Sequence, residues 1–298
     1  MSADEIREKT DMQKAIVRPA ASVRILSPDR VGRIFPHIVL IVLLFTSLMP
    51  FVWMFFGSFK TYVELTSSKT LLPINWTFDN YVQITQRVGF PRAFINTTLV
   101  AVVVTAATLL TSSVAGYVFS KYRFWGREQL FTVLLSTMMV PFAVVLVPLY
   151  VTIANIALAD KLAGIVITGL CSTFGIFLMR QFMESIPNDL IDAGRIDGAG
   201  EWWIFTRVVL PLAKAPLSAL AVFTFLGNWD SFLWPLVVLT SPENRTLPLV
   251  LAGLRSLYWS RYELYAAGSM LTVLPVMIIY AAASKQFVRG IAMTGIKA

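Results

Sequence analysis

Six long stretches of this chain are apolar and almost free of charge, and they limit the possible folds more than any other feature. Five contain no Asp, Glu, Lys or Arg, namely residues 35–59, 93–120, 129–159, 162–179 and 264–284, and residues 215–242 contain only Asp230. Each is long enough for the roughly 17–25 residues that cross a bilayer as a helix. Because hydrocarbon cannot hydrogen-bond the backbone, and the stretches lack the alternation of barrel strands, we expect helices.

The composition supports a lipid environment. The chain is 56% hydrophobic and 14% charged, whereas a soluble domain is about a quarter charged. We therefore predict an all-α polytopic membrane protein with about six transmembrane helices. The expected spans are residues 35–58, 94–118, 130–153, 162–182, 215–239 and 263–284. They form a transmembrane domain over residues 35–284, between an N-terminal tail (1–34) and a C-terminal tail (285–298).

The distribution of basic residues predicts the orientation. With six spans, 17 of the 25 Lys and Arg residues fall on the side that holds both termini, and 8 fall on the other side. Because basic residues concentrate in cytoplasmic loops, both termini are expected in the cytoplasm. The charged first 34 residues precede any apolar run and do not resemble a cleaved signal peptide. The net charge of +8 thus reflects topology, and no nucleic-acid partner is expected.

The scarcity of Cys and His disfavours several kinds of chemistry. The chain has one cysteine, Cys171, and one histidine, His37. A disulfide needs two cysteines, and a structural zinc site needs about four such ligands. No G-x-S-x-G motif accompanies the single histidine. We therefore predict no metal site and no catalytic residue, which argues against an intramembrane enzyme.

The longest predicted cytoplasmic connection has helical signals and exposed aromatic residues. Pro187 suits the start of a helix, and Gly198 can adopt a positive φ at its end. Trp202 and Trp203 follow in a segment too polar to lie within lipid. Aromatic anchors of this kind are typical of protein interfaces. An amphipathic segment lying on lipid headgroups is the alternative.

Within this connection lies the run Asp192, Ala193, Gly194, Arg195, Ile196, Asp197, Gly198 and Ala199, followed by Leu210 and Pro211. This run resembles the EAA signature of ABC importer permeases. The signature has Glu-Ala-Ala, two residues, Asp-Gly-Ala and a later leucine-proline. Asp192 replaces the usual Glu and Gly194 the second Ala, which keeps a carboxylate and a small residue.

Other motifs extend the resemblance to carbohydrate-uptake permeases of the maltose-transporter type. They are Asn228-Trp229-Asp230 with Trp234-Pro235, Ser120 to Phe124, Gly126-Arg127 and Phe287 to Gly290. Together they cover the chain from about the first span to the C-terminus. The resemblance implies the MetI-like fold of binding-protein-dependent permeases and the bacterial inner membrane.

The resemblance also implies partners. This chain would pair with a second permease subunit, as a heterodimer, and with two copies of an ATPase and an extracytoplasmic solute-binding protein that delivers a carbohydrate. The chain contains no Gly-Lys dipeptide and so no phosphate-binding loop. We therefore expect no cofactor and no enzyme activity in this subunit, with ATP and Mg bound by the separate ATPase.

The resemblance assigns residues 185–211 to a coupling loop that docks on the ATPase. By matched position or by proximity, the contact residues would be Asp192, Ala193, Gly194, Arg195, Asp197, Gly198, Ala199, Trp202 and Trp203.

Asp230 marks a possible substrate pathway, because a carboxylate inside an apolar span usually faces the protein interior or a wet cavity. Asn228, Trp229 and Trp234 accompany it, and tryptophan faces beside hydrogen-bonding groups suit sugars. Two alternatives stay open. One is an interfacial tryptophan belt with Asp230 satisfied structurally, and the other is a second permease that makes most of the solute contacts.

The external segment 241–262 occupies the position of the family's scoop loop, which reaches toward the binding protein. The predicted contact residues are Glu243, Asn244, Arg245, Tyr258 and Trp259. A surface loop packed on its own subunit is the alternative. For the whole chain, rivals are a permease for a polyol or a sugar-phosphate ester and a secondary transporter or channel. A secondary transporter or channel would show several charged residues within its spans, and five of the six spans have none.

Overall fold

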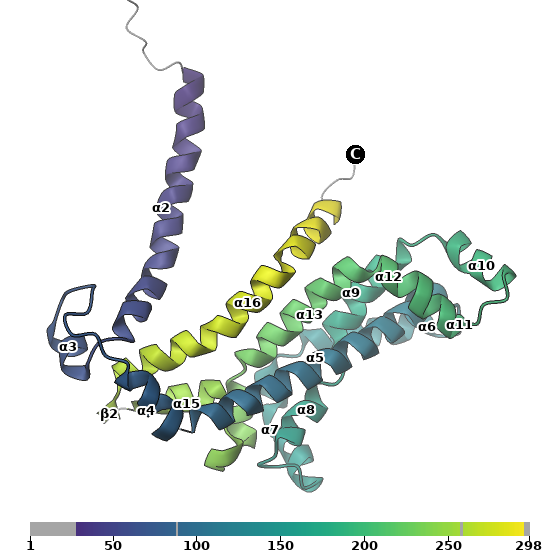
Figure 1. Ribbon diagram of the computed structural model, residues 1–298. Coiled ribbons are helices and arrows are strands. Elements are labelled where there is room, and N and C mark those ends of the chain that lie inside the picture. Colours follow the sequence, from purple (N-terminus) through teal and green to yellow (C-terminus); the bar gives the residue numbers. More distant parts are fainter. Residues whose placement is uncertain (1–27, 88, 257–258, 295–298) are drawn as a thin grey trace, which may run out of the picture. The chain divides into compact units, whose positions relative to one another are not determined.

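The structure is a computed structural model that describes residues 28–87, 89–256 and 259–294 (Figure 1). It divides into two units, residues 1–52 and 53–298, each of which is described by itself. The described part of the first unit belongs to helix α2 (Pro28–Gly57), which contains Pro36 and Pro50. All side chains from residue 35 to 52 are exposed. An exposed apolar helix of this length is suited to solvation by lipid.

The second unit is almost entirely helical. Its first helices are α3 (Tyr62–Ser67), α4 (Asp79–Arg87), α5 (Phe90–Lys121), α6 (Arg127–Ser136), the 3₁₀ turn η1 (Thr137–Met139), α7 (Phe142–Asn155), α8 (Leu162–Gly169) and α9 (Thr173–Glu184). Next come α10 (Asn188–Ile196), α11 (Glu201–Ile204), the π-helical turn η2 (Phe205–Val209), α12 (Leu210–Leu212), α13 (Lys214–Trp229) and α14 (Leu233–Val238). The 3₁₀ turn η3 (Pro242–Asn244), α15 (Leu247–Gly253), the antiparallel strands β1 (Arg255–Ser256) and β2 (Trp259–Ser260), and α16 (Tyr262–Thr294) complete the described chain.

Helix α5 is the central element of this unit. It packs along α9 and α13, and α13 packs in turn on α16 (Figure 1). Close approach depends on small residues, since a Cβ added at Gly116 of α5 would lie 2.6 Å from the Met179 side chain of α9. In membranes the hydrophobic effect does not drive helices together, and small residues at helix crossings allow the close packing that stabilises their association.

The helices are long and apolar enough to account for the predicted membrane protein. Four described helical segments pass a length and hydropathy test for a membrane span, namely Phe35–Gly57, Phe90–Lys121, Leu162–Glu184 and Tyr262–Ala281. Two sharply bent helix pairs also pass together, which gives up to six spans in the described chain. The upper count equals the predicted number.

Three predicted spans are not single helices. The span expected over residues 130–153 is bent by 101° between Arg127–Met139 and Phe142–Asn155. Pro141 lies at the bend, and Val140 before it is extended. A proline has no N–H for the helix and disfavours helical backbone in the residue before it, so the helix stops here.

The predicted fifth span, residues 215–239, is also interrupted. Helix α13 ends at Trp229 and α14 begins only at Leu233. On its other side, α13 forms the second bent pair, 79°, with the segment Glu201–Leu212. The predicted fourth span, 162–182, has a shorter interruption between α8 and α9, where the Ser172 hydroxyl accepts a hydrogen bond from the Gly175 N–H. This capping contact starts the new helix.

At the interruption between α8 and α9, α5 supplies the missing backbone partners. The hydroxyl of Thr108 donates to the Gly169 carbonyl at 3.0 Å, and that of Thr111 donates to the Leu170 carbonyl at 2.9 Å. Unpaired carbonyl groups at membrane depth are costly, and side-chain hydroxyls from a neighbouring helix compensate for the broken ladder.

Candidate functional site

Residues 185–211, called here the EAA-like loop, fold into a short helical hairpin. Helix α10 begins after Pro187, with Asp189 in its first turn, and ends at Ile196, with Asp197 as the C-cap residue. Gly198 follows with φ of +80°, a conformation that costs glycine little. The helix start and the glycine turn expected from the sequence are both confirmed.

One face of the EAA-like loop is anchored in an apolar core. Ile191 of α10 is 2% exposed, and Ile204 and Phe205 after the turn are 0% and 3% exposed. They share this core with Met183 of α9. A Cβ at Gly194 would meet the Ile204 side chain at 3.1 Å, so the glycine at this signature position lets α10 lie close to α11.

The opposite face of the EAA-like loop exposes apolar side chains. Ile196 is 85% exposed, Trp202 63% and Trp203 54%. Asp192, Ala193 and Asp197 are exposed beside them, and Gly198 has open space around it. Ala199 instead packs partly against the core. Ile196 was not among the predicted contact residues. It lies five residues after buried Ile191 in α10, and at 3.6 residues per turn this spacing places it on another face, away from the core.

A carboxylate that the sequence did not single out ties the EAA-like loop to α5. Glu201 accepts hydrogen bonds from the Tyr122 hydroxyl at 2.5 Å, the Tyr117 hydroxyl at 3.3 Å and Arg195 Nε at 2.7 Å. Arg195 also donates to Asp192 at 3.0 Å. We call Glu201, Arg195, Tyr117 and Tyr122 the Glu201 cluster.

Raised pKa values keep Tyr122 protonated and Arg195 cationic, so both remain hydrogen-bond donors to Glu201. Burial, followed by the hydrogen bond to Glu201, raises the pKa of Tyr122, so its hydroxyl stays protonated and donates. The hydrogen bond to Glu201 is the main cause that raises the pKa of Arg195, which remains cationic.

Two of the four predicted substrate-pathway residues lie in the core. Trp229 is 1% exposed and packs against Phe94 and Phe225, with ring centroids 5.6 and 5.5 Å away. Trp234 is 7% exposed, and its Nε1 donates to the Thr168 hydroxyl at 3.0 Å. Neither indole offers an open face, because helix packing buries both. Their sequence neighbours do not reveal this.

The other two predicted pathway residues lie next to open space. Asn228 lines a pocket of about 340 Å³ between α5, α13 and the α8–α9 interruption. Its lining residues are Val104, Thr108, Gly169, Cys171, Ser172, Phe174, Phe223, Thr224, Gly227 and Asn228. Asp230 is exposed just after α13, and its carboxylate accepts no hydrogen bond within the described residues. The structural satisfaction of Asp230 considered above is therefore not seen in that part of the chain.

Residues 240–247, called here the outer loop, are held mainly through the backbone. The side-chain amide of Asn96 donates to the carbonyls of Glu243 and Arg245 at 2.9 and 3.0 Å. The Thr97 hydroxyl accepts from the Leu247 N–H at 2.8 Å. Both anchors belong to the first turns of α5.

Asp160, before α8, holds the other part of the outer loop. Its carboxylate accepts from the N–H groups of Thr240 and Ser241, each at 2.9 Å, and from the Ser241 hydroxyl. Its carbonyl accepts from the Asn244 side chain at 2.5 Å. These bonds, the Ser241 hydroxyl first, hold the pKa of Asp160 well below its usual range.

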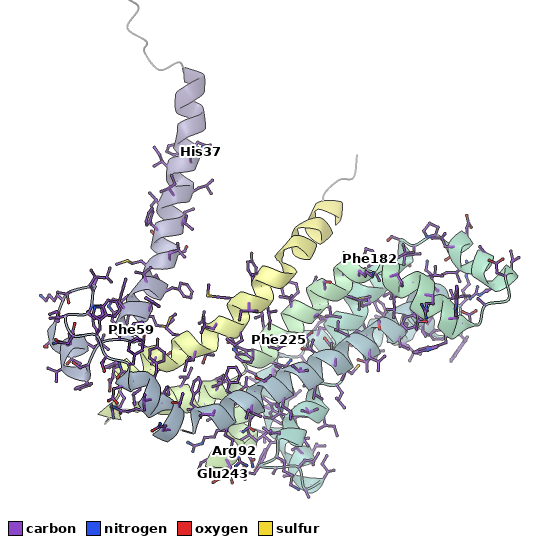
Figure 2. All side chains as sticks on the ribbon, viewed as in Figure 1. His37, Phe59, Arg92, Phe182, Phe225 and Glu243 are labelled. Atoms are coloured by element: carbon purple, nitrogen blue, oxygen red, sulfur yellow. The ribbon has the colours of Figure 1, made fainter. Side chains whose placement is uncertain are left out.

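The residues predicted to contact the binding protein differ in how exposed their side chains are. Glu243 and Arg245 are exposed, whereas Asn244 is half-buried and bonded to Asp160. Figure 2 shows Glu243 at the end of the second unit opposite Phe182 of α9. Tyr258 lies outside the described residues, and of Trp259 the structure describes the backbone in β2.

Comparison with known proteins identifies the architecture. Residues 108–292 match the family described as binding-protein-dependent transport system inner membrane component. The chain belongs to this family. The match includes the EAA-like loop, α13 and the outer loop.

Relatives that match this chain over most of their length support the same family assignment. The chain is 36% identical over 261 residues to the lactose transport system permease protein LacG of Rhizobium radiobacter, covering 88% of this chain and 95% of that one. It is 35% identical to the arabinooligosaccharides transport system permease protein AraQ of Bacillus subtilis (strain 168), covering 84% and 90%. A solved bacterial ABC transporter that imports the acidic polysaccharide alginate contains a chain with a TM-score of 0.78 and 25% identity, covering 87% and 97%.

These matches confirm several sequence-based predictions. The family-type ABC permease fold, the inner-membrane location and the role as the membrane component of a binding-protein-dependent transport system are as expected. The individual site residues and the cytoplasmic position of both termini stay predictions.

Proposed function

We propose that this permease forms half of the translocation channel of an ATP-driven carbohydrate importer. A separate ATPase would hydrolyse ATP and grip the EAA-like loop, while a solute-binding protein would dock at the outer loop. A second permease chain would complete the channel. The single observation that carries the proposal is the exposed apolar face of the EAA-like loop, formed by Ile196, Trp202 and Trp203.

This face has the properties of a protein contact. Its aromatic side chains stand on a hairpin fixed by buried Ile191 and Ile204. A rigid platform reduces the entropy lost on binding, and exposed tryptophans of this kind are frequent hot spots. The coupling surface would comprise Asp192, Ala193, Gly194, Arg195, Ile196, Asp197, Gly198, Ala199, Trp202 and Trp203. Both termini would then lie on the same cytoplasmic side.

The solute pathway would follow the pocket beside Asn228, with exposed Asp230 at its end. The pocket combines hydroxyls of Ser172 and Thr224 with the aromatic rings of Phe174 and Phe223. Hydroxyl and amide groups suit the rim of a sugar, and aromatic faces suit its C–H surface. Trp229 and Trp234 would support this wall from behind.

The sugar class rests on the relatives, which are named for lactose and arabinooligosaccharides. The test uses the binding protein of the same system, titrated calorimetrically with lactose, arabinooligosaccharides, a polyol and a sugar phosphate. Saturable binding of a sugar supports the carbohydrate assignment. If only the polyol or only the sugar phosphate binds, the carbohydrate assignment is wrong and that compound gives the substrate class.

The transport mechanism is tested by reconstitution. The importer, with its ATPase and binding protein, is placed in proteoliposomes, and solute uptake is measured with ATP and with ATP omitted. We expect uptake only with ATP. Uptake driven by an ion gradient through the permeases alone would show a secondary transporter instead.

The coupling face is tested with Trp202→Ser/Trp203→Ser. We expect normal membrane insertion but loss of the ATPase from the affinity-purified complex. The matched control is Trp125→Ser, since Trp125 is 99% exposed and lies outside the EAA-like loop. Retention of the ATPase by the double variant would remove the coupling face from the proposal.

A further inference from the structure

The Glu201 cluster joins three elements through one carboxylate. Glu201 begins α11, Arg195 lies in the last turn of α10, and Tyr117 and Tyr122 lie at the end of α5. The tyrosines are 84 and 79 residues away from Glu201 in the chain. Therefore the contact is tertiary, and it is the place where the EAA-like loop meets α5 through charge and hydroxyl groups.

Burial of one donor makes this contact persistent. Tyr117 is 4% exposed, and its ring lies 5.2 Å from Phe205 and 5.6 Å from Tyr122. A buried hydroxyl without a partner is unfavourable, so the hydrogen bond to Glu201 at 3.3 Å stabilises the buried Tyr117 side chain. The carboxylate side chain is itself 45% exposed, and this exposure limits the strength of its ion pair with Arg195.

A second tie holds the other end of α10. Lys121, the last residue of α5, donates to the Ile186 carbonyl and to the Asn188 side chain, the latter at 3.0 Å. Helix α10 is thus connected to the end of α5 both before its first turn and, through Arg195 and Glu201, after its last turn.

Helix α5 continues from these ties to the pocket. Val104 and Thr108 of α5 line it, and α5 is one unbroken helix from Phe90 to Lys121. A displacement of the end of α5 therefore moves one wall of the pocket, because a continuous hydrogen-bonded helix transmits displacement along its axis.

We propose that Glu201 is a positioning residue that transmits movement of the EAA-like loop to α5, and so to the pocket wall. This rests on the proposed function, in which the ATPase moves the loop. Ile191 and Ile204 belong to a buried apolar core that does not include Glu201, so we expect the loop to stay folded in its absence. A cluster that only stabilised the loop would affect ATPase binding. A transmitting cluster affects the amount of solute moved per ATP.

The experiment measures three quantities on the complete reconstituted importer: ATPase subunit retained, ATP hydrolysed and solute transported. The variants are Glu201→Gln and Tyr117→Phe/Tyr122→Phe. We expect normal ATPase retention, continued hydrolysis and about a fivefold fall in solute moved per ATP, since each variant weakens or removes charge-assisted hydrogen bonds. The triple variant should be no worse than Glu201→Gln, because all its substitutions break one cluster.

The control is Tyr150→Phe, which removes a hydroxyl from α7, outside the Glu201 cluster. An unchanged ratio of solute to ATP in both cluster variants overturns the transmission role. Loss of the ATPase subunit overturns it too, and makes the cluster a structural support of the loop. If the wild-type importer itself shows no ATP-dependent uptake, the proposed function fails instead.

Discussion

The EAA-like loop and the outer loop both attach to α5, one at its last turns and the other at its first, but through different chemical groups. The EAA-like loop is tied mainly by side chains to side chains, above all Tyr117 and Tyr122 to Glu201, with one bond from Lys121 to the Ile186 carbonyl. The outer loop is tied by side chains to backbone, from Asn96, Thr97 and Asp160. About 31 Å of helix separates Asn96 from Tyr117 at 1.5 Å per residue.

The difference concerns which substitutions disturb the attachment of each loop to the rest of the unit. Backbone anchors are indifferent to the side chains of the residues they hold, so Glu243 and Arg245 are free to suit a partner. Side-chain anchors are sensitive to single substitutions. We infer that the outer loop is a fixed platform with a variable surface, whereas the EAA-like loop is a connection that single residues control.

The largest expected effect is at the turn of the EAA-like loop. Gly198→Val places a β-branched residue at φ of +80°, where it is strained. We expect ATPase retention and ATP-dependent uptake to fall by at least about tenfold, since a distortion worth ~1.4 kcal/mol at the contact gives a factor of ten. Co-purification and uptake measure this.

Gly200→Val is the matched control for this change. Gly200 also has open space around it, but its φ is −71°, which valine adopts readily. It should retain the ATPase. Equal losses in the two variants would mean that added bulk, rather than the left-handed turn, disrupts the contact.

At the opposite end of α5, Asn96→Ala should destabilise the outer loop. The change leaves the carbonyls of Glu243 and Arg245 without their donor, and because both bonds are only partly buried the cost is about 1 kcal/mol. Amide exchange within residues 240–247 should rise, as measured by mass spectrometry in detergent. Glu243→Ala/Arg245→Ala is the comparison, and exchange should stay at the wild-type level, because the anchors reach only their backbone.

Asp160→Asn should produce a smaller increase in exchange over the same residues. The amide keeps one acceptor oxygen where the carboxylate offers two to Thr240 and Ser241. Because the folded pKa of Asp160 lies below its ordinary value, its contribution is complete above about pH 4 and is lost as the pH falls further. Exchange, corrected for its intrinsic pH dependence, should therefore be unchanged between pH 5 and 8 in the wild type.

The smallest effect is expected for Gly194→Ala, which restores the usual signature residue in α10. Alanine favours the helix by up to about 1 kcal/mol. Its Cβ would approach the Ile204 side chain to 3.1 Å, which opposes this gain. We expect a change in melting temperature of no more than about 2 °C for a domain of this size. A large loss would show that the glycine is required for close packing between α10 and α11.

The sequence predicted the local features of the EAA-like loop well. Pro187 and Gly198 act through their own backbone, and these effects need only near neighbours. It missed Glu201 as a contact, since Tyr117 and Tyr122 lie some 80 residues earlier. The exposure of Ile196 was accessible in principle from its spacing to buried Ile191.

The sequence was less informative about the inner surfaces of the membrane domain. Asp230 and Trp229 are adjacent, yet one is exposed and the other is fully buried. In an apolar span, hydropathy is similar on every face, so it does not indicate which face packs against α5 and which borders the pocket. The break between α8 and α9 likewise depends on another helix, because hydroxyls of α5 pair with the carbonyls of Gly169 and Leu170.

By itself, the sequence determined the membrane environment, the approximate number of spans and the family, because length, apolarity and short motifs are local properties that need no folded neighbours. Only the tertiary structure decided which tryptophans are buried, which hydroxyls pair with the backbone at the α8–α9 break and which side chains hold the two loops. Those outcomes depend on contacts between residues far apart in the chain. Such contacts follow from packing and from hydrogen-bond satisfaction between helices, which no local pattern encodes.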